Sequence, residues 1–182
     1  MGLDMFLYKK TYIGANYEHN QITGTLDLYI KLPIELNNVS EIKEEVAYWR
    51  KANHIHKWFV DNCQDGNDDC GEYRVTLQQL RTLVGICKRV LSAKEAEETN
   101  KYTYDNNAAK NIDDYGNLTT TMDSTKIAEE LLPTQSGFFF GGTDIDEWYY
   151  EDIKSTIKQI EPVIANVSDD DFDIRFYYHS SW

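Results

Sequence analysis

Strand signals near opposite ends of the chain constrain the fold more than any other feature. The first is Leu3–Ile13, and the second is the alternating segment FDIRFYYH at residues 172–179. Alternation of apolar and polar residues is typical of a strand with one buried face. Because both segments need a layer of helices to bury their apolar faces, they are predicted to share one sheet.

The residues between these ends predict helices and further strands. Helices are expected over Ile42–Cys63, Leu77–Leu91, Lys126–Leu132 and Thr143–Ile164. Strands are expected at Thr23–Leu32, Glu72–Val75 and Thr134–Gly142, the first in an antiparallel hairpin with Leu3–Ile13. The chain is therefore predicted to be a single α+β domain, residues 1–182, with a mostly antiparallel sheet formed by the N- and C-terminal strands and covered by about three helices.

Residues at the expected helix ends fit these boundaries. Thr76 and Gln79 have the spacing of a capping box, and Thr143 is expected to cap the last long helix. Pro162 is expected to kink or end that helix. Residues 100–125 are rich in Asn, Asp and Thr and show neither period, so they are expected to form a variable, mobile excursion.

Acidic residues dominate the charge of the chain. It has 18 basic and 31 acidic residues, a net charge of -13, and thirteen acidic against four basic residues lie in the last 60 positions. This balance opposes general binding to nucleic acid. The absence of an apolar run long enough for a membrane span, or of a signal peptide, predicts a cytoplasmic protein.

Neither a metal site nor a disulfide framework is predicted. Cys63, Cys70 and Cys87 are an odd number with no CxxC pair, so reduced thiols are expected. The acidic loop from Asp65 lacks the glycine and glutamate that a calcium loop needs. His54 and His56, two apart in an expected helix, would face different directions. No cofactor motif is present either.

The segment VAYWRKANHIHKWFV at residues 46–60 is the one basic island in this acidic chain. It contains no acidic residue and combines cations with two tryptophans. Cations interleaved with aromatic rings suit an anionic ligand that can stack, such as a nucleotide. With the loop at Gln135 and Ser136, the candidate ligand-binding residues are Trp49, Arg50, Lys51, Asn53, His56, Trp58, Gln135 and Ser136.

A purely structural interpretation of this island stays open. An amphipathic helix with an aromatic core face and a solvated basic face gives the same pattern. Asn53 and His56 fall on the buried stripe, where each must find hydrogen-bond partners. The aromatic C-terminus, which ends in Trp182, is expected to be buried, with a homodimer contact or a ligand wall as the alternative.

Four segments together resemble a family of small proteins encoded by bacteriophages and prophages. They are MGLDMFLYKK, EVAYWRKANHIHKWFV, LLPTQSGFFFGGTDIDEWY and FYYHSSW. The resemblance covers both ends and the middle of the chain and leaves residues 100–125 unmatched. It implies a viral accessory protein that acts in the bacterial cytoplasm. It brings no reaction, cofactor or residue role.

Three functions are compatible with these patterns. The leading one is a protein that binds without turnover and sequesters a small anionic, nucleotide-like ligand of the host, as counter-defence. The alternative is an acidic inhibitor or nucleic-acid mimic that binds a host protein through the acidic residues Asp144, Asp146, Glu147, Glu151 and Asp152. The third is a small enzyme with His56 as a base near Asp61, Asp65 or Glu72. No catalytic residue is assigned, because no nucleophile or metal cluster accompanies the histidine.

Overall fold

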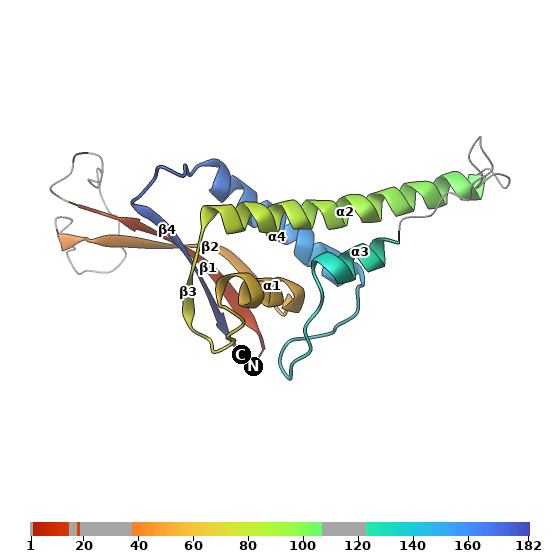
Figure 1. Cartoon of the computed structure of the whole chain (residues 1–182), viewed down its shortest axis with the longest axis horizontal. Helices are drawn as coiled ribbons and strands as arrows, with labels where there is room; N and C mark the ends of the chain where they lie inside the picture. Colours follow the sequence, from red (N-terminus) through yellow and green to blue (C-terminus); the bar gives the residue numbers. More distant parts are fainter. Residues whose placement is uncertain (1, 15–17, 19–37, 107–122) are drawn as a thin grey trace, which may run out of the picture.

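The computed structural model describes residues 2–14, 18, 38–106 and 123–182, and its helices pack on an antiparallel sheet (Figure 1). The strands are β1 (Asp4–Tyr12), β2 (Glu41–Arg50), β3 (Glu72–Val75) and β4 (Ile174–Ser181). The helices are α1 (Asn53–Cys63), α2 (Leu77–Asn106), α3 (Ser124–Leu131) and α4 (Glu147–Ala165). Within these residues the strand order is β2-β1-β4-β3 and every pair is antiparallel, which confirms the predicted α+β class.

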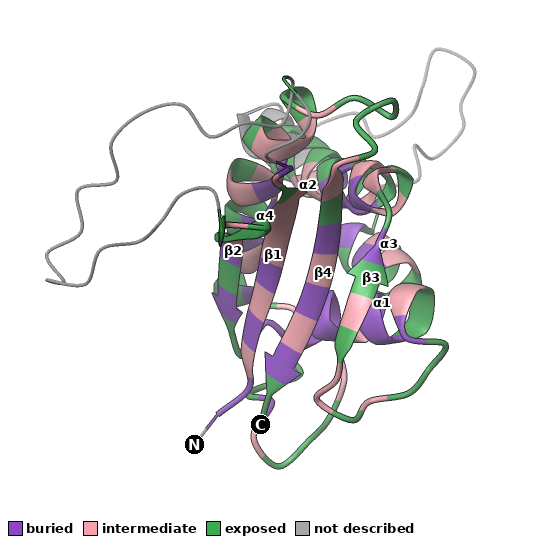
Figure 2. Cartoon of the chain, turned by 90° about the vertical axis from the view of Figure 1, so that its left-hand side faces the viewer, coloured by how far each residue is buried: buried purple, intermediate pink, exposed green. Residues whose placement is uncertain are grey.

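The terminal strands β1 and β4 lie side by side in the middle of the sheet, so the prediction that they share one sheet is confirmed. They pair from Asp4 with Ser181 to Thr11 with Ile174. Burial alternates over residues 4–7 of β1 and over most of β4, and Figure 2 shows it as bands. The side chains of Met5, Leu7 and Tyr178 are fully buried. The period of two in the sequence therefore marks the face of the sheet that the helices cover.

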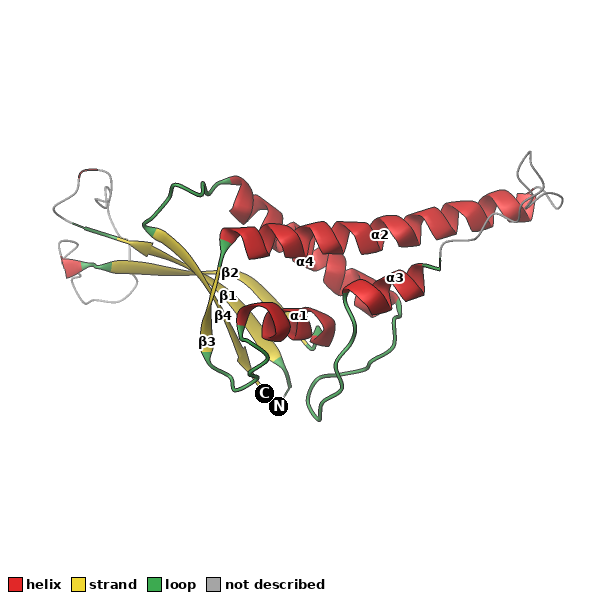
Figure 3. Cartoon of the chain, viewed as in Figure 1, coloured by secondary structure: helices red, strands yellow, loops and turns green. Residues whose placement is uncertain are grey.

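Two long helices, α2 and α4, lie side by side across that face (Figure 3). Their inner sides contribute Leu80, Leu83, Ile153 and Ile160 to the core, all fully buried. The predicted capping box at the start of α2 is confirmed, because Gln79 N donates to Thr76 Oγ1 over 3.1 Å and Thr76 N donates to Gln79 Oε1 over 2.8 Å. The short helix expected before Pro133 is also present, as α3.

The helix expected over Ile42–Cys63 is wrong in its first half. Residues 41–50 form the edge strand β2, and α1 begins only at Asn53. Burial in the last part of β2 has a period of two, since Ala47 and Trp49 are buried while Tyr48 and Arg50 are exposed. The spacing of the apolar residues suits a helix, but the segment pairs with β1 and buries only Ala47 and Trp49, while Ile42 and Tyr48 stay exposed. The tertiary contact therefore prevails over the local period.

Three boundaries also differ from expectation. Helix α2 continues to Asn106, so the excursion expected at 100–125 begins within a helix. Asp146, rather than Thr143, caps α4, because the helix begins only at Glu147. Pro162 lies inside α4, which runs on to Ala165, so the proline does not end the helix at once.

The segment Thr134–Gly142 is a loop, and the prediction of a buried strand there is wrong. Phe138 at its tip is 95% exposed, whereas Phe140 inserts into the core. Gly141 has φ +89°, and a Cβ at this position would lie 3.2 Å from Cβ of Lys51. The positive φ and the close approach to the turn after β2 therefore both favour glycine at this point.

Some predictions fall outside the described residues. The strand at Thr23–Leu32, its hairpin with Leu3–Ile13 and residues 107–122 of the expected excursion are among them. Within the described part, no helix is both long and apolar enough to cross a membrane.

Candidate functional site

A cavity of about 390 Å³ opens where the end of β2, the start of α1, the loop after α3 and the start of α4 meet. Its lining residues are Arg50, Lys51, Asn53, His54, Thr134, Gly141, Gly142, Asp144, Asp146, Trp148, Tyr149 and Asp152. Its volume lies within the range of about 300 to 1,000 Å³ that is usual for small-molecule sites. Segments about 90 residues apart in the sequence build it.

The cationic part of the lining comes from the turn between β2 and α1. The Arg50 side chain is 60% exposed, and its Nε lies 3.9 Å from Asp4 Oδ1, a distance that leaves the guanidinium available to another partner. Lys51 has φ 61°, a left-handed conformation that a lysine rarely adopts. Helix α1 then begins at Asn53 with no side-chain cap and no acidic residue in its first turn. Its positive dipole end therefore lies beside two cations.

The acidic part of the lining comes from Asp144, Asp146 and Asp152. Asp146 Oδ1 accepts hydrogen bonds from the backbone amides of Trp148 (3.0 Å) and Tyr149 (3.1 Å), so this carboxylate is engaged in capping α4. Burial, with a smaller contribution from the charge of Asp146, raises the pKa of Asp152 from 3.8 to about 6. No other described residue forms a hydrogen bond or ion pair with the Asp152 carboxyl. The cavity is thus lined by both signs of charge.

His54 is a second buried polar residue of the cavity, beside Asn53. It is 3% exposed, its ring lies 4.2 Å from the ring of Tyr149, and its Nε2 has no hydrogen-bond partner among the described residues. Burial lowers the pKa of His54 from 6.5 to about 3, so the ring is neutral near pH 7. A buried, unpaired polar atom costs about 1 to 3 kcal/mol. The structure therefore retains an unsatisfied polar atom on a residue that lines the cavity.

Asn53 shapes the cavity by holding the loop at 134–142. Its Nδ2 donates to the carbonyl oxygens of Phe140 (3.1 Å) and Gly142 (2.6 Å), and its Oδ1 accepts from Gln135 N (3.1 Å). These bonds confirm that the buried Asn53 finds partners. Because all of them go to the loop, Asn53 positions the wall of the cavity and has little capacity left for a ligand.

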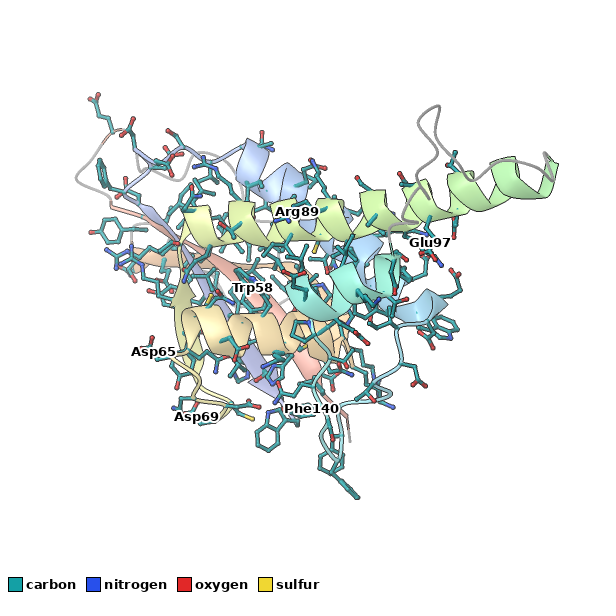
Figure 4. The ribbon with its side chains drawn as sticks, turned by 45° about the vertical axis from the view of Figure 1, so that its right-hand side comes forward. Trp58, Asp65, Asp69, Arg89, Glu97 and Phe140 are labelled. Atoms are coloured by element: carbon teal, nitrogen blue, oxygen red, sulfur yellow. The ribbon has the colours of Figure 1, made fainter. Side chains whose placement is uncertain are left out.

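The two tryptophans predicted from the basic island lie in the core and do not line the cavity. Trp49 is 3% exposed and its Nε1 donates to Thr156 Oγ1 over 2.8 Å. Trp58 projects from α1 toward α2 (Figure 4) and packs edge-on against Phe59. Their side chains therefore stabilise the fold. Trp148 is the exposed aromatic residue at the cavity, at 78% exposure, and its position off the apolar stripe of α4 is a sequence signal that would have identified it.

His56 is closed off from the cavity. It is fully buried, with Tyr178 Oη 2.7 Å from Nδ1 and Asp68 Oδ2 3.0 Å from Nε2. Trp182 Nε1 donates to the other oxygen of Asp68, which ties the aromatic C-terminus to this network. The carboxylates predicted to assist a histidine base are elsewhere, since Asp65 projects from the α1–β3 loop (Figure 4) and Glu72 binds Lys43 over 2.8 Å. The network explains His56 as a structural residue.

Of the eight residues predicted to bind a ligand, Arg50, Lys51 and Asn53 line the cavity. Gln135 adjoins it through Asn53, and Ser136 is exposed on the same loop. The acidic lining residues Asp144, Asp146 and Asp152 were predicted from the sequence as part of an acidic face and now join the cations in one cavity. His54, Trp148 and Tyr149 were not predicted.

The described part of the chain contains no group of three or more His, Cys, Asp or Glu side chains arranged to hold a metal ion. Comparisons with protein-family models, with curated proteins and with solved structures found no match.

Proposed function

We propose that this chain binds, without turnover, a small ligand with an anionic group, and that the cavity beside α1 is the binding site. The observation that supports this most is that Arg50 and Lys51, both predicted from the acid-free island, line one cavity together with the uncapped start of α1. Two cations beside the positive dipole end of a helix are a combination that favours phosphate or carboxylate.

The charge of the whole chain makes such a local site necessary for any anion. A net charge of -13 repels anions at long range, so binding must come from short-range contacts. Arg50 offers a planar fork for two oxygens, and Lys51 offers a point charge. The dipole of α1 adds about 0.3 to 1 kcal/mol for an anion at its first turn.

The resemblance to phage and prophage proteins suggests the biological role of such binding. A phage protein that holds a host nucleotide without converting it lowers the free concentration of that nucleotide. Counter-defence through sequestration of a small nucleotide signal is the role that fits a cavity with cations and no exposed nucleophile–base pair among the described residues.

The acidic-surface alternative has less support. Three of the five acidic residues assigned to that surface line the cavity, and Asp146 is engaged as the cap of α4. Glu151, a fourth member, pairs with Lys154 over 2.7 Å. A surface that mimics nucleic acid needs its charges free to meet a basic partner.

The test is calorimetric titration of the protein with linear and cyclic nucleotides. The variant Arg50→Ala/Lys51→Ala is expected to weaken binding at least tenfold. Alanine at position 51 keeps a Cβ, so the left-handed backbone there is no more strained than with lysine. Circular dichroism should show unchanged folding.

The matched control is Arg74→Ala/Arg175→Ala, which removes the same charge from a separate cavity of about 380 Å³ between β3, α2 and the start of β4. The control should bind like the wild type. If no nucleotide binds the wild type, or if the control and not the Arg50/Lys51 variant loses binding, the proposed function is wrong.

A further inference from the structure

The cavity also contains hydrogen-bond acceptors that an anion alone would not use. They come from the loop after α3 and from α4, whereas the cations come from the β2–α1 turn. A ligand with only a phosphate would bring its charge near Asp144 and Asp152, which repel it. The lining therefore fits a ligand that is anionic at one end and rich in N–H donors at the other.

Asp152 is a partly buried acceptor whose carboxyl has no hydrogen-bond or ion-pair partner among the described residues. It lies partly buried on the first turns of α4, next to the carboxylate of Asp146, and no cation pairs with it among the described residues. A partly buried carboxyl without a cationic partner is stabilised by a neutral donor such as an amino group. The donor supplies hydrogen bonds, and no second charge has to be desolvated.

His54 provides an independent observation at the same cavity. His54 lines the cavity and is almost completely buried, yet its Nε2 has no hydrogen-bond partner in the part of the chain that the structure describes. A neutral imidazole nitrogen is a donor or an acceptor according to its tautomer. A chemical group that offers a donor and an acceptor side by side satisfies either tautomer. The amino-bearing edge of adenine, cytosine or guanine has this arrangement.

Trp148 supplies the flat apolar surface that such a ring would need. It lines the cavity, and because it is 78% exposed, much of its surface is open for a base to stack on. Stacking of a base on an aromatic side chain contributes about 1 to 3 kcal/mol.

We infer, resting on the proposed function, that the cavity selects nucleotides whose base carries an amino group, and that Asp152 and His54 recognise this group. Arg50 and Lys51 hold the phosphate, and Trp148 stacks on the base. Carboxylates commonly accept hydrogen bonds from nucleobase amino groups, so Asp152 is the main determinant of the preference.

The experiment titrates the full chain with three pairs of 5′-monophosphates: AMP with purine riboside monophosphate, GMP with IMP, and CMP with UMP. Within each pair, one member has the amino group and the other lacks it. At least one amino-bearing member should bind ten times more tightly than its counterpart. In Asp152→Asn and in His54→Phe this preference should fall below threefold.

Glu151→Gln is the control for the charge change, because Glu151 neighbours Asp152 on α4 but is not among the residues that line the cavity. It should keep the wild-type preference. Equal binding of both members of every pair, with loss of binding in Arg50→Ala/Lys51→Ala, would refute the inference and leave the proposed function intact. A preference that survives in both Asp152→Asn and His54→Phe would also refute it. Absence of all binding to the wild type would refute the proposed function itself.

Discussion

Replacing His54 with phenylalanine should make the protein less sensitive to acid. Burial lowers the pKa of this histidine from 6.5 to about 3, so the folded state keeps the ring neutral while the unfolded state protonates it below pH 6.5. The free energy of unfolding therefore falls as the pH drops from 6.5 toward 3. Phenylalanine takes up no proton, and its ring replaces the imidazole that packs against Tyr149.

The magnitude follows from the two pKa values. At pH 5 the solution is about 1.5 pH units below the pKa of this histidine in the unfolded state. Protonation of the unfolded state therefore lowers the free energy of unfolding by about 2 kcal/mol. Urea denaturation at pH 7.5 and pH 5.0, followed by tryptophan fluorescence, measures this loss in both proteins. The wild type should lose about 2 kcal/mol more than His54→Phe between these two pH values.

Other groups that titrate in this range do not alter the comparison. The raised pKa of Asp152 works in the opposite direction, since its protonated form is favoured in the folded state and stability rises as the pH falls through about 6. Asp152 is present in both proteins, so its contribution cancels in the difference. An equal loss of stability in both proteins would refute the assignment. Observation by NMR of His54 protonation near pH 6 in the folded wild type would refute it as well.

Three further predictions address the site and the fold. Nucleotide binding should quench the tryptophan fluorescence of the wild type, and Trp148→Phe should remove most of the change while binding persists in calorimetry, because Trp148 is the tryptophan at the cavity. Asn53→Ala should lower the free energy of unfolding by about 2 to 4 kcal/mol in urea denaturation, because it leaves loop groups without their partner; a change below 0.5 kcal/mol would contradict the role of Asn53. Deletion of residues 176–182 should abolish cooperative thermal unfolding, and an unchanged melting temperature would contradict the central position of β4.

The sequence was most informative where local and tertiary preferences agree. Strands β1 and β4, the capping box at Thr76 and the start of α2 were predictable because each follows from a short pattern of residues. Strand β2 was not, because its apolar residues fit a helix and only its pairing with β1 selects the strand. Phe140 was assigned to a buried strand, whereas it enters the core from a loop held by Asn53, a contact 87 residues away.

The site was predictable in part for the same reason. The acid-free segment identified Arg50 and Lys51, since exposed cations leave a signal in composition. It also selected Trp49 and Trp58, which pack in the core, because an aromatic residue in the sequence looks the same whether it is buried or exposed. His54 was not identified because its role depends on a ring nitrogen that has no partner among the described residues. Whether a polar atom finds a partner depends on the folded structure and leaves no pattern in the sequence.

The position of β4 between β1 and β3 also determines the order in which the strands can pair during translation. β1 and β2 leave the ribosome early and can pair with each other, but β3 pairs with β4 alone within the described sheet and must wait for it. The pairing of Asp4 with Ser181 closes nearly the whole chain into one loop, a non-local contact of the kind that slows folding.

The turn with Arg50 and Lys51 emerges well before the α4 residues that complete the cavity, so binding competence is gained only after translation has passed residue 152. A nascent chain stalled before that point should be unable to capture the ligand.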